Sequence, residues 1–119
     1  MHSINIDRST SLVEVRLTGF LTPKHAAAAD VDVRAAIRSL GDKVGQHKTI
    51  YDVSQVQIAP SETIEVFQQM FAAPGERASK VAFYTPSPLG RLQLQRIREA
   101  RDDIGIFADR SAALTWLHS

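Results

Sequence analysis

The amino-acid sequence predicts an α/β domain with a mostly parallel, five-stranded sheet. Short apolar segments of strand length alternate with longer segments of helical period, in the order β-β-α-β-α-β-α-β-α. Because a helix separates each later strand from the next, these strands should pair in parallel, with the first strand antiparallel at or near an edge. The chain has 119 residues, of which 44% are apolar, which suits a single core. We therefore expect residues 1–119 to form one domain.

Two N-terminal strands are expected at residues 3–7 and 12–18. In the second, Val13, Val15 and Leu17 alternate with charged residues, as in a sheet with one wetter face. The polar linker of residues 8–11 is short, so the two strands should form a hairpin.

The first helix is expected to begin at Thr22-Pro23, because threonine caps helices well and proline fits the first helical position. Gly41 should end it. The apolar residues between them have helical spacing: Ala26, Ala29, Val33, Ile37 and Leu40.

The middle of the chain predicts a strand at residues 48–53, a helix beginning at Pro60 or Ser61, and a strand at residues 80–84. The helix should bury one apolar face: Ile64, Phe67 and Phe71.

The last third predicts a helix over residues 88–101, a strand at 104–107 and a final helix capped by Asp109. In the first of these helices, Leu94 is expected to project away from the apolar residues that should face inward: Leu89, Leu92, Ile97 and Ala100. The final helix is expected to dock through four residues: Ala112, Ala113, Trp116 and Leu117. If the strand order follows the sequence order, right-handed crossovers should place the helices largely on one side of the sheet.

Composition excludes several functional classes. With 14 basic and 13 acidic side chains the net charge is +1, which gives no reason to expect nucleic-acid binding. The absence of cysteine excludes disulfides, thiol catalysis and cysteine-bound metals. No apolar run approaches the roughly 20 residues of a membrane span. Residues 1–16 lack the pattern of a signal peptide, so a cytoplasmic protein is expected.

No cofactor or metal site is expected. The four histidines, His2, His25, His47 and His118, lack metal-binding spacing, and we expect them at the surface, where His25 could line a pocket. The sequence also contains no phosphate-binding loop, dinucleotide fingerprint or nucleophile elbow.

Residues 52–64 read Asp-Val-Ser-Gln-Val-Gln-Ile-Ala-Pro-Ser-Glu-Thr-Ile, a strand end that leads into a helix. With the element order, this segment resembles the SpoIIAA-like fold, which includes the STAS domains of anti-sigma factor antagonists and sulfate transporters. The loop of that family commonly reads Asp-Leu-Ser-x-Val-x-Phe-Ile-Asp-Ser-Ser-Gly-Leu. Its Asp, Ser, Val, first loop Ser and Leu match Asp52, Ser54, Val56, Ser61 and Ile64. The ending Ala-Leu-Thr-Trp-Leu is also similar to small bacterial SpoIIAA-like proteins.

The chain departs from that loop pattern at three positions. Pro60, Glu62 and Thr63 stand where the family has Asp, a second Ser or Thr, and Gly. In the family the loop and the following helix bind an anti-sigma kinase, so the resemblance implies a regulatory module without catalytic activity. The lipid-transfer (CRAL-TRIO) proteins have a similar sheet, which implies the alternative of a carrier for a small apolar or lipid-like ligand.

Four residues form the candidate phosphorylation or partner loop: Asp52, Ser54, Ser61 and Thr63. The Ser61 hydroxyl could accept a phosphate at a helix N-terminus, or it could simply cap the helix, which the residue type favours. Asp52 and Ser54 lie at the carboxyl end of a parallel strand, where α/β sheets bind ligands, although an Asx turn explains the same residues.

A second candidate site is a partner or ligand surface away from the predicted core: Val66, Met70, Leu94, Arg91 and Arg98. Arg91, Arg98 and Arg101 could share a side with Leu94, although a solvated helix face explains these arginines equally. Such a patch, or a bare sheet face, would need a partner, and homodimerisation is the simplest form. The sequence thus predicts a non-enzymatic interaction module that presents residues 52–71.

Overall fold

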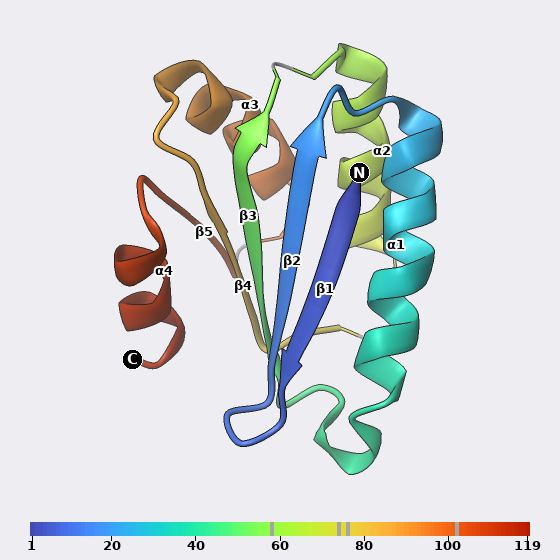
Figure 1. Ribbon diagram of the computed structural model, residues 1–119, viewed down its shortest axis with the longest axis vertical. Coiled ribbons are helices and arrows are strands. Elements are labelled where there is room, and N and C mark those ends of the chain that lie inside the picture. The colour runs from blue at the N-terminus through green and yellow to red at the C-terminus, as the bar shows by residue number, and fades with distance from the viewer. Residues whose placement is uncertain (58, 74, 76, 102) are drawn as a thin grey trace.

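The computed structural model describes residues 1–57, 59–73, 75, 77–101 and 103–119. Figure 1 shows a twisted sheet with helices packed against it. The strands of the described residues are β1 (His2–Asp7), β2 (Leu12–Gly19), β3 (Lys48–Val56), β4 (Lys80–Tyr84) and β5 (Ile104–Phe107). The helices are α1 (Pro23–Arg38), α2 (Ser61–Ala72), α3 (Pro88–Arg98) and α4 (Arg110–Leu117), with a short 3-10 turn, η1 (Gly41–Lys43).

The strand order in the sheet follows the sequence, β1-β2-β3-β4-β5. β1 pairs antiparallel with β2 as a hairpin, and the remaining neighbours pair in parallel. The predicted fold class is therefore confirmed. β3 is longer than predicted, because Gln55 and Val56 pair with the end of β2 beyond a register shift. That extension depends on pairing with a neighbouring strand, and such pairing cannot be predicted from the local sequence pattern.

Three helices cover one face of the sheet and the fourth covers part of the other. The right-handed crossovers place α1, α2 and α3 on the same side, as expected. The main core lies there and contains Val15, Tyr51 and Phe83. Side chains of alternate strand residues, such as Ile50 and Ala82, face the opposite side and pack against α4 in a smaller core.

The part of the sheet that α4 leaves uncovered is polar. α4 lies against β3, β4 and β5, so β1 and β2 are open on that side (Figure 1). Ser3, Asn5 and Arg16 are exposed there. The uncovered face therefore does not require an apolar partner. The expectation that a bare sheet face would need a partner to cover it is wrong for this face.

The inward face of α3 differs from the predicted one. Leu94 and Ile97 are buried, whereas Leu89 and Leu92 are 62% and 65% exposed. Ile97 lies five positions after Leu92, which rotates the two side chains by about 140° from one another around a helix, so they cannot both face the core. The inward stripe is Gly90, Leu94 and Ile97, and the missing side chain of Gly90 leaves little apolar signal in the sequence. The helix also ends at Arg98, before the predicted end at residue 101.

α4 docks through three of the four predicted residues: Ala113 and Leu117 belong to the smaller core, and Trp116 packs against it. Ala113 and Leu117, four positions apart, are fully buried, and Trp116 is half-buried. Ala112 is exposed instead, because it lies on the adjacent, outer side of the helix. In the described part of the chain, no helix has the length and apolar character to cross a membrane.

His47 is a further correction, because it is fully buried rather than at the surface. Its Nδ1 accepts a hydrogen bond from the Gly45 N–H at 3.1 Å, so Nε2 carries the proton of the neutral ring. Nε2 has no hydrogen-bond partner among the described residues. Burial, together with the nearby Arg101 charge, holds the pKa of His47 below its ordinary value. His25 and His118 are exposed, as predicted.

Candidate functional site

The segment that the sequence singles out lies at the carboxyl edge of the sheet. β2, β3 and β4 all end at this edge, and α2 and α3 begin there (Figure 1). In open α/β sheets, ligands bind outside the carboxyl ends of the strands. The structure therefore places Asp52, Ser54, Ser61 and Thr63 along one edge, but in different surroundings.

Asp52 is the centre of a polar cluster on the α4 side of the sheet. Arg16, Asp52 and Tyr84 occupy matching positions on β2, β3 and β4. The Arg16 Nε donates to Asp52 Oδ2 at 3.2 Å, and the Ser54 backbone N–H and hydroxyl both donate to Oδ1. The two bonds from Ser54 are those of an Asx-type turn, so this interpretation of the Asp52–Ser54 pair is confirmed.

The charge state of this cluster indicates a structural role. Burial alone would raise the pKa of Asp52, but hydrogen bonds from Ser54 and Tyr84 and the Arg16 charge outweigh it and lower the pKa. Burial, the Asp52 charge and the hydrogen bond to Asp52 raise the pKa of Tyr84 to about 12. Asp52 is thus a stable carboxylate and Tyr84 a neutral phenol, so neither is poised to exchange a proton at neutral pH.

Ser54 and Thr63 are poorly placed for phosphorylation. Ser54 is half-buried and its hydroxyl donates to Asp52. Thr63 is fully buried, and its hydroxyl donates to the Leu21 carbonyl at 2.8 Å. The prediction that Thr63 belongs to an accessible loop is wrong, because α2 begins at Ser61 and turns Thr63 towards the end of β2.

Ser61 is exposed and does not cap its helix. The N-cap position of α2 is Pro60, which has no side-chain donor or acceptor, and no side-chain capping bond is made there. The other helices of the described residues are capped conventionally, by Thr22, Ser87 and Asp109. The capping interpretation of Ser61 is therefore wrong, and the positive end of the α2 dipole faces solvent beside a free hydroxyl.

An apolar cavity of about 50 Å³ lies beneath the start of α2. Its walls include Leu17, Ile64, Phe67 and Leu94. Gln93 of α3 closes one side: its side chain accepts from the Ala59 N–H at 2.9 Å and donates to the Ala59 carbonyl at 2.6 Å. Together with the Thr63–Leu21 bond, this pair of hydrogen bonds holds the loop before α2 over the cavity. Neither Gln93 nor Thr63 shows this role in the sequence, since both depend on contacts between distant segments.

The predicted partner surface does not form one patch. Leu94 is 6% exposed and lines the apolar cavity, because it belongs to the inward face of α3. Val66 and Met70 are half-buried and pack against the main core. The Arg91 guanidinium donates to the Thr85 carbonyl at 2.9 Å, and Arg98 alone of the five residues is exposed.

Arg101 also leaves the expected basic surface. It is 5% exposed, and its guanidinium pairs with Asp103 and donates to the Ala78 carbonyl. Because α3 ends before Arg101, this side chain contacts the residues that precede β4 and β5 instead of continuing the helix face. His25, in contrast, lines an open apolar hollow with His2 and Leu21. This agrees with the prediction that His25 could line a pocket.

Comparison with solved structures supports the fold. The chain is similar to an uncharacterized protein of the DUF3478 family with a SpoIIAA-like fold from Shewanella loihica PV-4. The TM-score is 0.71 over 98% of this chain and 93% of that one, at 18% sequence identity. The protein has a SpoIIAA-like fold. No family model and no curated protein matches the sequence.

Proposed function

We propose that the protein is a non-enzymatic regulatory module that binds another protein through the start of α2. The observation that carries this proposal is the exposed Ser61 on a helix N-terminus without a side-chain cap. The backbone N–H groups of that first turn and the helix dipole together favour an acidic group. A carboxylate from a partner, or a phosphate on Ser61 itself, would supply the missing cap.

The exposed apolar side chains of α3 extend this surface. Leu89 and Leu92 lie three positions apart on the outer side of a helix that also begins at the carboxyl edge. A polar helix tip beside an apolar pair is the composition of many protein-binding surfaces, with an apolar centre and a polar rim. A second copy of the chain is one partner that would fit this surface, in place of the predicted five-residue surface, which does not form one patch.

Catalysis has weak support at this site. The Ser54 hydroxyl is within reach of a carboxylate, but the lowered pKa of Asp52 makes that carboxylate a weak base. Ser61, the accessible hydroxyl, has no basic group among its hydrogen-bond partners in the described residues. We therefore propose binding rather than turnover.

A photo-crosslinking amino acid at position 61 tests the proposal in the cells of origin. We expect one protein to be captured from position 61 and from Leu92, but not from Val31, an exposed residue of α1 that serves as a matched control. Phosphate mapping on the purified protein tests modification of Ser61. Equal capture from all three positions, with no phosphate on Ser61, would contradict the proposal. Light scattering separates self-association from a foreign partner, because the monomer mass is 13.1 kDa.

The apolar cavity under α2 supports a second function, the carriage of a small apolar or lipid-like ligand. At about 50 Å³ the cavity holds only one or two waters, so α2 would have to move outward to admit a lipid. The polar contacts of Gln93 and Thr63 are what such a movement would break. Native mass spectrometry of the freshly purified protein tests this function: an apolar adduct that is more abundant in Gln93→Ala would support it, and unliganded protein in both forms would exclude it.

A further inference from the structure

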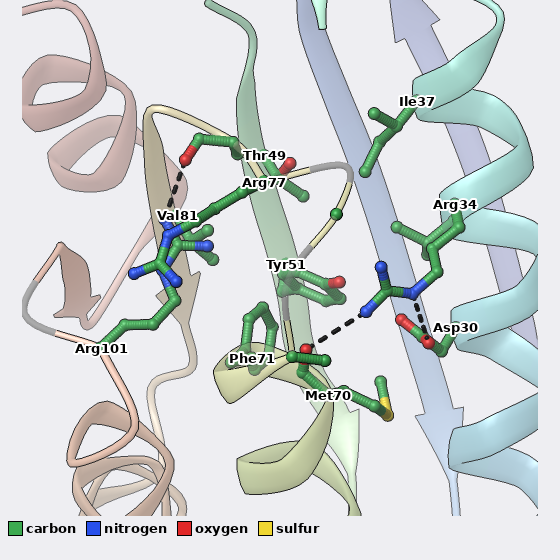
Figure 2. Close-up of a pocket in the computed structure, with 14 residues that line it drawn as sticks. Asp30, Arg34, Ile37, Thr49, Tyr51, Met70, Phe71, Arg77, Val81 and Arg101 are labelled. Atoms are coloured by element: carbon green, nitrogen blue, oxygen red, sulfur yellow. Dashed lines mark hydrogen bonds and ion pairs between the residues drawn. The ribbon is translucent and has the colours of Figure 1, made fainter. Parts of the chain in front are cut away.

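A second pocket lies at the opposite, amino edge of the sheet, beneath the end of α2 (Figure 2). It has a free volume of about 40 Å³ and is bounded by α1, β3, β4 and the loop that follows α2. Gly75 and Arg77 form its exposed rim, whereas Thr49 and Tyr51 form its buried floor. The pocket is thus open to solvent on one side and polar at its base.

The Tyr51 hydroxyl is a donor at the base of the pocket without a protein partner in the described part of the chain. The residue is 4% exposed, and its hydroxyl makes no hydrogen bond with the described residues. The ring is held by stacking on Phe83 at 4.7 Å and by an edge contact with Phe71 at 5.7 Å, so the hydroxyl cannot swing to another partner. Figure 2 shows this hydroxyl pointing into the pocket, towards Arg34. The hydroxyl of Thr49, which is 3% exposed, likewise has no partner among these residues.

In the described part of the chain, four charged residues line the pocket: three are arginines and the fourth is Asp30. Arg34 is oriented by Asp30 at 2.9 Å and by the Met70 carbonyl at 3.2 Å. Arg101 is oriented by Asp103 and by the Ala78 carbonyl. Arg77, at the rim, forms no hydrogen bond or ion pair within the described part of the chain. Arg34 and Arg101 are therefore each paired with a carboxylate, whereas Arg77 has no such pair among the described residues. Figure 2 shows Arg34 beside the Tyr51 hydroxyl and the side chain of Arg77 extending to Arg101 on the other side of the pocket.

We propose that this pocket binds a small oxyanion, such as a free phosphate or sulfate or the terminal phosphate or carboxylate group of a small metabolite. Donors without acceptors select an acceptor-rich ligand, and the guanidinium groups favour one with negative charge. A metal cation would be repelled by the arginines, and an apolar ligand would leave the Tyr51 and Thr49 hydroxyls unsatisfied. Arg77 adds a third positive charge at the rim.

Water is the competing occupant, because a polar cavity of this size accommodates one or two molecules. Water would satisfy the hydroxyls equally well but would not respond to the charge of Arg77. Charge dependence therefore separates the two occupants.

Titration of the purified protein with inorganic phosphate, sulfate and acetate, followed by amide NMR shifts, tests the proposal. We expect saturable shifts centred on Tyr51, Gly75 and Ala78. Tyr51→Phe should weaken binding about tenfold or more, as loss of a hydrogen bond to a charged group predicts. Arg77→Gln should weaken it severalfold, whereas Arg98→Gln, the same charge change on exposed α3, should leave it unchanged.

The three probes also identify the form of the ligand. Saturation by phosphate and sulfate alone indicates a tetrahedral anion, and saturation by acetate as well indicates a carboxylate group. The thermal stability of each variant in anion-free buffer shows that the variant is folded. The proposal is overturned if none of the three anions saturates the protein at tens of millimolar, or if Tyr51→Phe and Arg77→Gln bind like the unchanged chain.

Discussion

The two ends of the main core contain hollows of similar size and opposite chemistry. The cavity at the carboxyl edge, about 50 Å³, is apolar and is closed by neutral hydrogen bonds from Gln93 and Thr63. The pocket at the amino edge, about 40 Å³, has a hydroxyl floor and arginine walls. α2, β3 and β4 border both hollows, whereas α1 borders the amino-edge pocket and α3 borders the carboxyl-edge cavity. The difference teaches that helix packing leaves space at both ends of the layer, and that the residues at the strand and helix ends decide what can fill each space.

Leu94→Ala should have the largest effect, because it removes a buried side chain from the wall of the apolar cavity. We expect a loss of about 2–5 kcal/mol in the free energy of unfolding. Leu92→Ala, on the outer side of the same helix, should change it by less than about 0.5 kcal/mol. Urea denaturation measures both. Similar losses for the two variants would show that the inward face of α3 has been assigned wrongly.

Thr63→Val should cost about 1–3 kcal/mol, because it leaves the Leu21 carbonyl without its donor while keeping the side-chain shape. Thr115→Val is the matched control: that hydroxyl also donates to a backbone carbonyl, but at an exposed position. The same urea measurement compares them. An unchanged stability in Thr63→Val would mean that this bond does not hold the start of α2 in place.

His47, which is close enough to Arg101 at the amino end of the core to feel its charge, should make stability depend on pH. Its pKa is 6.5 in the unfolded chain and lower in the folded protein, so below pH 6.5 the unfolded chain binds more protons. The free energy of unfolding should therefore be level above this pH and fall as the pH drops towards the folded pKa. His47→Asn should reduce that acid dependence, whereas His25→Asn, at an exposed position, should keep it. Equal slopes for both would remove His47 as the cause.

Tyr51→Phe should have the smallest effect on stability when no anion is present. Its hydroxyl has no partner among the described residues, so its removal should leave the free energy of unfolding within about 0.5 kcal/mol or raise it. Tyr84→Phe at the other end should instead destabilise, by about 1 kcal/mol, because Tyr84 gives a hydrogen bond to Asp52. Thermal unfolding in anion-free buffer compares them. A large loss in Tyr51→Phe would mean that the hydroxyl is already satisfied.

Local pattern predicted the candidate site less well than the fold. The strand end at Asp52 and the turn through Ser54 follow from residue type, because aspartate and serine bond to their own backbone. The role of Ser61 did not follow, because the helix begins at Ser61 itself, one residue earlier than a serine cap at that position would require. The closure by Gln93 and the oxyanion pocket at Tyr51 involve residues more than 20 positions apart, so no short segment signals them.

By itself, the sequence determined the element order, the parallel sheet with its antiparallel first strand, and the caps at Thr22 and Asp109. These depend on period, chain connection and bonds within a few residues. Only the tertiary structure decided which side of α3 faces inward, that Thr63, His47 and Arg101 are buried, and that Tyr51 faces a cationic pocket. The burial and orientation of these side chains depend on which distant segment lies beside each of them. The packing of the helices on the sheet determines those neighbours.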